Sequence, residues 1–169
     1  MRIIHIFLIV TLLSACVKSG DGPNYPIFTG FTNTYFDGSI IGYEDLTDWT
    51  LDDFWFPCEK NLFSNYNITN LDNNCDSQPM FYISHAYPNP SSDVVCINMT
   101  SEQALSSYFV FVNRSFNVIN EIENFQFVGE YTKCFDLSSV PNNSLIRCYY
   151  IFSSDNCTYK GHGDIKIKR

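Results

Sequence analysis

The sequence predicts a mainly β protein: an antiparallel, Ig-like β-sandwich preceded by a loop-rich extension with one short helix. Short runs of β-branched and aromatic residues, separated by polar turns, fill the chain from Met80 onward. No long segment there has the 3.6-residue apolar period of an amphipathic helix. Aromatic residues make up 17% of the chain, which is ample material for a core. About seven short strands of this kind are typical of a sandwich, which we place at residues 80–169.

The expected strands follow one another between turn signals. In the run Val94–Met99, the side chains of Val95, Ile97 and Met99 point to one face because side chains alternate along a strand. Two prolines, at 88 and 90, impose an extended or turning backbone before that run, and the segment 153–156 predicts a hairpin turn. The other expected strands are 80–83, 108–113, 117–122, 124–128, 131–137, 145–152, 157–160 and 164–168.

The extension at 26–79 is acidic, rich in Asn and loop-like. Pro57 suits the first position of a helix, and Glu59 lies in the first turn, where the helix dipole favours an acid. We therefore predict a short helix near 57–64. The stretch 65–76 is dominated by Asn and Asp and is expected to form a loop.

The extension contains one dense block, at 44–55, in which five acids alternate with aromatic residues. Clustered carboxylates suggest a calcium site, but the block lacks the spacing and the glycine of an EF-hand loop. We favour the alternative, in which the aromatic side chains dock onto the main body while the carboxylates stay in solvent, so no metal or other cofactor is expected. The docking residues are Trp49, Phe54 and Trp55, and the candidate calcium ligands are Asp45, Asp48, Asp52 and Asp53.

The first residues have the features of a cleaved export signal at 1–15. Arg2 supplies a positive charge, and the apolar core at 3–13 is too short to span a bilayer. The sequence Leu13-Ser14-Ala15-Cys16 resembles the lipobox of bacterial lipoproteins, and this resemblance implies that Cys16 is lipidated and becomes the first mature residue. The stretch 16–25 then serves as a flexible tether. A plain signal peptide ending near Ala15 is the alternative.

Six cysteines remain when Cys16 is set aside. An even number in an exported chain suggests disulfide bonds, with free buried thiols and metal binding as the alternatives. We expect Cys58 and Cys75 to pair, because they bracket a polar loop that is costly in entropy to close. The six candidates are Cys58, Cys75, Cys96, Cys134, Cys148 and Cys157.

The charge of the chain disfavours a nucleic-acid partner or an anionic lipid surface. The formal net charge is −8, and removal of 1–15 takes away one base and no acid. A strongly acidic surface repels polyanions.

The stretch 86–97 (AYPNPSSDVVCI) resembles the start of the C-terminal sorting domain of the type IX secretion system of Bacteroidota. The strand at 108–113, the segment 135–138, the strand at 145–152 and the basic end at 166–169 follow in the family's order. The segment 144–149 lacks a glycine that the family places there, and no large cargo precedes the domain. The segments 47–63 and 160–165 further resemble small Bacteroidota lipoproteins. The resemblance implies a structural relative of the sorting domain within a small lipoprotein.

No catalytic constellation stands out. His162 and Asp164, or His85, would be needed for a Cys-His or Ser-His-Asp site. However, His162 lies between two glycines, His85 adjoins the proline turn, and no nucleophile-elbow motif is present. The chain is therefore not expected to be an enzyme.

These observations predict a lipid-anchored protein of the outer membrane or cell envelope. The membrane is its partner through the N-terminal lipid, and the domain is expected to contact an envelope protein or a glycan. One alternative is a sorting or anchoring module of the type IX system. The other is a secreted, disulfide-linked eukaryotic glycoprotein, suggested by five N-x-S/T triplets. They begin at Asn67, Asn98, Asn113, Asn142 and Asn156.

Overall fold

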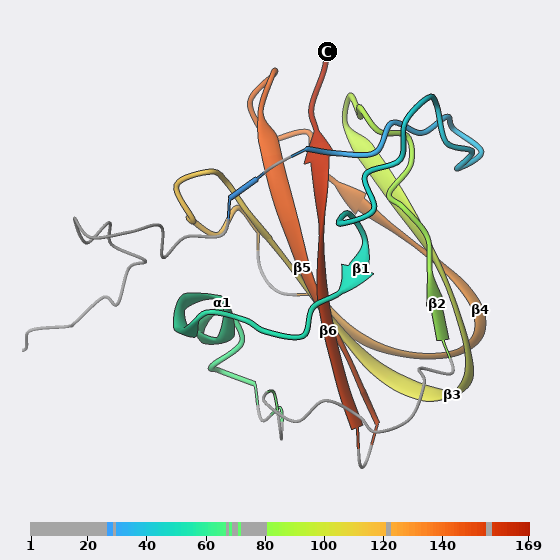
Figure 1. The fold of residues 1–169 in the computed structure, drawn as a ribbon, viewed down its shortest axis with the longest axis vertical. Helices are drawn as coiled ribbons and strands as arrows, with labels where there is room; N and C mark the ends of the chain where they lie inside the picture. Colours follow the sequence, from blue (N-terminus) through green and yellow to red (C-terminus); the bar gives the residue numbers. More distant parts are fainter. Residues whose placement is uncertain are drawn as a thin grey trace, which may run out of the picture.

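The computed structural model describes residues 27–28, 30–66, 68, 71, 81–120, 123–154 and 157–169, and these form one curled antiparallel sheet (Figure 1). The strand order is β1-β6-β5-β3-β2, and β4 pairs with β3. The mainly β, antiparallel prediction is confirmed. The elements are β1 (Thr50–Leu51), α1 (Pro57–Asn61), β2 (Phe81–Ile83), β3 (Val94–Val112), β4 (Glu123–Asp136), β5 (Leu145–Ser154) and β6 (Cys157–Lys166).

The curl of the sheet comes from β3, which bends at an irregularity in its pairing between Ser101 and Leu105. Its first half pairs with β2, and its second half pairs with β5. The strand β4 follows β3 along most of its length and curves with it (Figure 1). The sheet therefore folds around a single interior, and β2 and β5 occupy the same side of β3 at different heights.

Several strands expected to be separate are continuous. The runs expected at 94–99 and 108–113 both fall in β3, which ends at Val112. Those at 124–128 and 131–137 fall in β4, which ends at Asp136, and those at 157–160 and 164–168 fall in β6, which ends at Lys166. The strand expected at 117–122 is wrong for its described residues, since 117–120 form no strand and Val118 makes only an isolated bridge to Val112.

The main core lies inside the curl. Val95, Ile97 and Met99 all point into it and are at most 1% exposed, as their alternation predicts. Aromatic rings from three strands pack against one another there, led by Phe109, whose ring centroid is 5.3 Å from that of Phe135. A smaller cluster lies on the opposite face of β3 and β5. It consists of Trp55, Phe63, Val110, Val112, Tyr149 and Ile151.

The extension is part of the sheet. Its strand β1 pairs with β6, with Thr50 opposite His162. The helix α1 begins at Pro57 as predicted, and the carboxylate of Glu59 accepts a 2.6 Å hydrogen bond from the backbone N–H of Phe56. The helix ends at Asn61, before the predicted Ser64, and turns follow. No helix among the described residues is long and apolar enough to cross a membrane.

Candidate functional site

The aromatic residues of the acidic block hold the extension against the sheet. Trp49 is 4% exposed and its indole stacks on Tyr150 with ring centroids 5.9 Å apart. Trp55 is 1% exposed and packs between Phe63 and Tyr149. The docking prediction is thus confirmed for both tryptophans. It is wrong for Phe54, which is 65% exposed.

Two glycines of β6 make this docking possible. A Cβ at Gly163 would overlap the indole of Trp49, and a Cβ at Gly161 would overlap the Thr50 carbonyl and the Tyr150 hydroxyl. The backbone of β6 can therefore lie directly against the extension. Trp49 has a φ of 60°, in the left-handed region, where the chain turns into β1.

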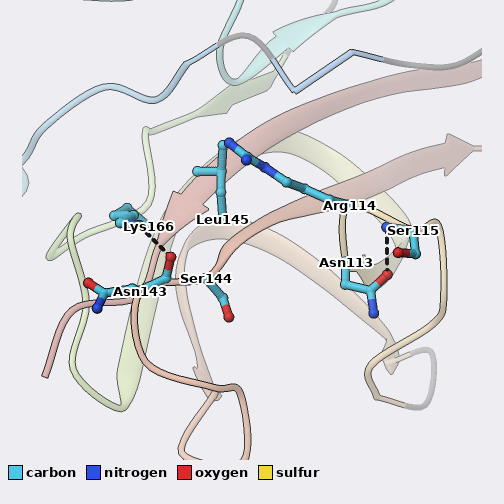
Figure 2. A pocket seen from close by; sticks show the side chains of 7 residues that line it. All are labelled: Asn113, Arg114, Ser115, Asn143, Ser144, Leu145 and Lys166. Atoms are coloured by element: carbon cyan, nitrogen blue, oxygen red, sulfur yellow. Dashed lines mark hydrogen bonds between the residues drawn. The ribbon is translucent and has the colours of Figure 1, made fainter.

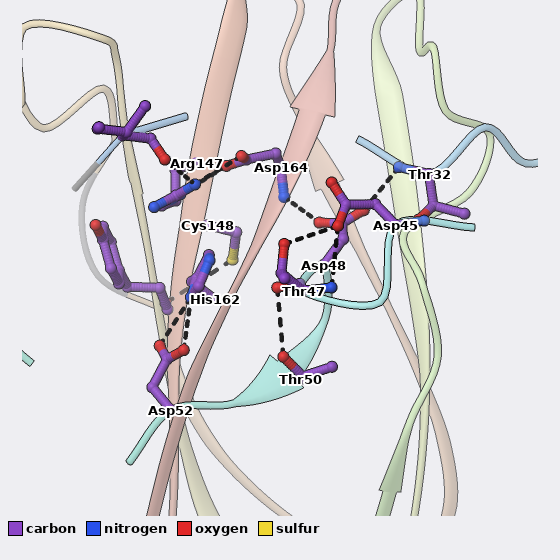
Figure 3. A network of polar contacts seen from close by, with 12 residues as sticks. Thr32, Asp45, Thr47, Asp48, Thr50, Asp52, Arg147, Cys148, His162 and Asp164 are labelled. Carbon is purple, nitrogen blue, oxygen red and sulfur yellow. Dashed lines mark hydrogen bonds and ion pairs between the residues drawn. The ribbon is translucent and has the colours of Figure 1, made fainter. Parts of the chain in front are cut away.

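Asp48 is buried at the centre of a polar network (Figure 3). One carboxylate oxygen accepts a hydrogen bond from the backbone N–H of Asp164 at 2.6 Å, and the other accepts from that of Thr32 at 2.8 Å. Burial raises the pKa of Asp48 to about 7, although these two hydrogen bonds act in the opposite direction. The expectation that the carboxylates of the block stay in solvent is wrong for this residue.

The second part of the network is the ion pair between Arg147 on β5 and Asp164 on β6. The Arg147 guanidinium donates to both carboxylate oxygens at 2.7 Å, and both side chains are 4% exposed. Arg147 also donates to the carbonyl of Ile27 at 3.0 Å and lies over the ring of Phe28. Hydrogen bonding to Asp164 raises the pKa of the guanidinium against the effect of burial. The pair therefore fixes the start of the described chain onto the sheet.

The four candidate calcium ligands do not converge. Asp52 accepts a 2.7 Å hydrogen bond from the Trp55 indole and lies 2.8 Å from Nδ1 of His162. Asp45 accepts two hydrogen bonds from Thr47, which lower the pKa of its carboxyl. Asp53 is exposed. Within the described ranges, no group of three or more His, Cys, Asp and Glu side chains is arranged to hold a metal ion.

The catalytic pairing considered from the sequence is not formed. The ring of His162 faces Asp52, while Asp164 is occupied by Arg147. His85 lies 3.5 Å from Glu44, and burial lowers the pKa of its imidazole, which favours the neutral ring.

The cysteines divide into bonded and free groups. Cys96 and Cys134 face each other across β3 and β4 and form a disulfide bond. Cys58 takes part in a disulfide bond as well, and so does Cys157. Cys148 is a free thiol with no exposed surface, and burial raises its pKa well above the ordinary range. For this residue the favoured disulfide prediction is wrong, and the alternative of a free buried thiol applies. Cys16 and Cys75 lie outside the described residues, as does the expected pairing of Cys58 with Cys75.

The proline turn at 87–90 forms hydrogen bonds with the end of β6. The Asn89 side chain is fully buried, donates to the carbonyl of Asp164 at 3.0 Å and accepts from the N–H of Lys166 at 2.9 Å. Ser91 forms a parallel bridge with Ile167 directly beyond β6. The motif that resembles a sorting domain therefore binds the C-terminal segment through its own side chain and backbone.

The C-terminal residue is also held in place. The guanidinium of Arg169 donates to Asp93 at 2.8 Å and to the carbonyls of Leu137, Ser138 and Val140 at 2.6–3.0 Å. Neighbouring Lys168 is exposed, and its side chain is free of hydrogen bonds and ion pairs to the described part of the chain.

A polar pocket of about 290 Å³ lies beside the end of β3, the start of β5 and the end of β6 (Figure 2). It contains two basic residues, Arg114 and Lys166, and no acid. Arg114 extends from the turn at 113–115 toward Leu145, and Lys166 donates to the carbonyl of Asn143 at 2.5 Å. The lining residues are Asn113, Arg114, Ser115, Asn143, Ser144, Leu145 and Lys166.

Exposed apolar side chains gather on an ordered loop of the extension. Phe36 and Tyr43 are each 84% exposed. The loop is fixed by hydrogen bonds between the backbones of Tyr35 and Ser39 and between those of Asn33 and Ile41. Six large apolar residues are exposed within twelve positions: Tyr35, Phe36, Ile40, Ile41, Tyr43 and Leu46.

Sequence reasoning missed the Arg147–Asp164 pair and the pocket. A signal for the pair was present, because the hairpin turn predicted at 153–156 sets the register in which Arg147 faces Asp164. No comparable signal marks the pocket, whose lining comes from two turns and two strands far apart in the sequence.

A scan against protein-family models finds no match to this chain, and searches of curated proteins and of solved structures also find none.

Proposed function

We propose that the chain is a lipid-anchored protein of the bacterial cell envelope that acts as a non-enzymatic interaction or structural module. The observation that carries this proposal is the sequence Leu13-Ser14-Ala15-Cys16 directly after a short apolar segment. Acylation of Cys16 would hold the protein at the membrane, since each buried CH₂ contributes roughly 0.8 kcal/mol and several chains act together.

The start of the described chain is compatible with a tether. Ile27 and Phe28 contact Arg147 at the body of the protein. Ile27 is eleven positions after Cys16, so the two residues lie at most about 40 Å apart when the chain is fully extended. An anchor at Cys16 would therefore keep the domain close to the membrane surface.

The exposed loop at 35–46 supports an interaction role. Ordered apolar surface of this kind on a soluble domain is typical of a contact with another macromolecule. The partner we propose is an envelope protein or a glycan. We further propose that the architecture is an Ig-like sandwich, because the curl of the sheet around one core brings two parts of the sheet face to face.

Metabolic labelling with an alkyne fatty acid tests the anchor. The wild-type protein should be labelled and recovered in the membrane fraction, and Cys16→Ser should be unlabelled and soluble. Ser14→Ala is the matched control, because it keeps a small residue beside Cys16 and should preserve labelling. Equal labelling of wild type and Cys16→Ser would refute the proposal.

The type IX alternative is tested by a point substitution at the basic end of the chain, because a deletion there would not be informative. Ile165 and Ile167 have no exposed surface, so deleting 165–169 would disrupt the core itself. Lys168→Glu changes the exposed basic end and leaves the core intact. Loss of surface display with unchanged thermal stability would favour a sorting module, and unchanged display would favour the lipoprotein.

The glycoprotein alternative depends on N-x-S/T asparagines, and two of them use their side-chain amides within the fold. The Asn98 amide oxygen, near the start of β3, accepts hydrogen bonds from Tyr87 and Thr132. Asn142 donates its amide to the carbonyl of Arg169 at 3.3 Å and accepts from the N–H of the same residue. An N-linked glycan on Asn142 would be attached to the nitrogen that makes this contact, and mass spectrometry of the purified protein tests for it.

A further inference from the structure

We propose that the polar pocket between the turn at 113–115 and the strands β5 and β6 binds the phosphate group of an anionic ligand. This site is independent of the lipid anchor and of the exposed apolar loop. The two basic side chains approach it from opposite sides, Arg114 from the turn after β3 and Lys166 from the end of β6 (Figure 2).

The basic side chains of the pocket retain donors for a ligand. Arg114 forms no ion pair or hydrogen bond with any described residue through its guanidinium, which has five N–H donors. The ammonium of Lys166 uses one donor on the carbonyl of Asn143 and has two more. Elsewhere in the described chain, Arg147 and Arg169 are both paired with carboxylates. A planar guanidinium and a nearby ammonium together match the oxygens of a phosphate.

Neutral donors complete the lining. The Asn113 side chain uses its carbonyl oxygen to accept from the backbone N–H groups of Ser115 and Asn117, so its amide hydrogens remain available. Ser115 and Ser144, which carry hydroxyl groups, are also among the lining residues. Hydroxyl and amide donors are common partners of phosphate oxygens in protein sites.

The charge around the pocket contrasts with the charge of the whole protein. The chain has a net charge of −8, and eighteen acids are spread along it, yet none lines this pocket. An acidic protein repels anions in general, so a local pair of uncompensated bases selects for an anion at this point. The volume of about 290 Å³ suits a phosphate with a small organic group attached.

Binding is measured by isothermal titration calorimetry on the full chain carrying Cys16→Ser, so that acylation does not affect the result. Sodium phosphate and glycerol 3-phosphate are titrated, with sodium acetate as the carboxylate comparison. Phosphate or its ester should bind, and acetate should bind at least about tenfold more weakly, since it offers fewer oxygens to the donors.

Two charge-matched variants locate the site. Arg114→Gln removes one positive charge from the pocket, and Lys168→Gln removes one from an exposed position outside it. Arg114→Gln should weaken phosphate binding about tenfold, corresponding to the loss of a charge-assisted hydrogen bond, whereas Lys168→Gln should leave it within about twofold. Both side chains are exposed, so both variants should keep the wild-type thermal stability.

Flotation with vesicles distinguishes the two sources of phosphate. Co-flotation with phosphatidylglycerol vesicles, absent with phosphatidylcholine vesicles and lost in Arg114→Gln, would identify a lipid headgroup. Binding of glycerol 3-phosphate without co-flotation would identify a soluble ester. The proposal is overturned if phosphate, its ester and the anionic vesicles all fail to bind, if acetate binds as well as phosphate, or if both variants weaken binding equally.

Discussion

Arg147 and Asp164 face each other across β5 and β6 and form a bidentate ion pair that is almost entirely enclosed, with each side chain 4% exposed. The desolvation of two buried charges offsets much of their attraction, so such a pair adds little net stability. Its importance lies in the dependence of each charge on the other. Asp164 also donates its backbone N–H to Asp48, so the pair connects the sheet to the extension.

Replacement of one member of the pair should be far more damaging than replacement of both. Arg147→Met leaves the Asp164 carboxylate buried without its partner, and the free energy of unfolding should fall by about 3–5 kcal/mol. Arg147→Met combined with Asp164→Leu should recover much of that loss. Urea unfolding followed by circular dichroism measures both changes. A single variant within about 1 kcal/mol of wild type would contradict the prediction.

Stability should decrease as the pH rises from about 4 to about 7, in part because of Asp48. Burial raises the pKa of its carboxyl from 3.8 to about 7 in the folded state. In that interval the folded protein keeps a proton that the unfolded chain releases, so the free energy of unfolding falls with increasing pH and levels off above about 7. Asp48 should account for about 2 kcal/mol of the decrease between pH 5 and pH 7.

The variant Asp48→Asn isolates this contribution. Its amide does not titrate, so its stability should depend less on pH over the same interval. Burial also raises the pKa values of Glu59 and Asp164, and part of the slope should therefore remain. Denaturant unfolding of both proteins at pH 5, 6 and 7 provides the comparison, and parallel pH profiles would show that Asp48 contributes nothing.

Gly163→Ala should displace the Trp49 indole, since the added methyl group would occupy the same space. Overpacking of this kind costs about 1–3 kcal/mol. The cost should largely disappear in a Trp49→Leu background, where the smaller side chain leaves room. A double-mutant cycle from urea unfolding gives the coupling between the two positions. A coupling energy near zero would show that the effect of Gly163→Ala does not depend on Trp49 and would contradict the prediction.

Asn89→Ala should destabilise the end of β6, because it leaves the carbonyl of Asp164 and the N–H of Lys166 without their side-chain partner. Two unsatisfied buried groups should cost about 2–4 kcal/mol. Ser92→Ala, at an exposed position in the same turn, is the control and should be close to neutral. The loss is measured as a decrease in the thermal midpoint and in the amide protection of β6. Equal values for the two variants would contradict the prediction that the Asn89 side chain stabilises the end of β6.

The sequence predicts the strands better than their continuity. The alternation of Val95, Ile97 and Met99 identifies the inner face of β3 correctly. Gly129, Gly161 and Gly163 resemble turn residues, yet all three lie within strands, two of them where Trp49 and Tyr150 pack closely. Close packing between distant segments has no local signal, and for this reason the sequence predicts two strands in place of each of β4 and β6.

The acidic block shows the same limit. Its composition predicts docking, and both tryptophans are buried, but Phe54 is exposed and Asp48 is enclosed. Hydrophobicity alone would predict that Phe54 is buried and that Asp48 is exposed. Their positions are decided by the pairing of β1 with β6, which directs Asp48 toward the backbone of Asp164. Such an outcome depends on partners more than a hundred positions away.

Thr50 pairs with His162, and Ser91 pairs with Ile167 across a long stretch of chain. Both contacts need β6 or the residue directly after it, so β1 and the turn before β3 have no backbone partner there until that segment is in place. Loops this long close late and slow the search for the native topology. β1 and the segment around Ser91 should therefore join the sheet only after β6 has paired with β5.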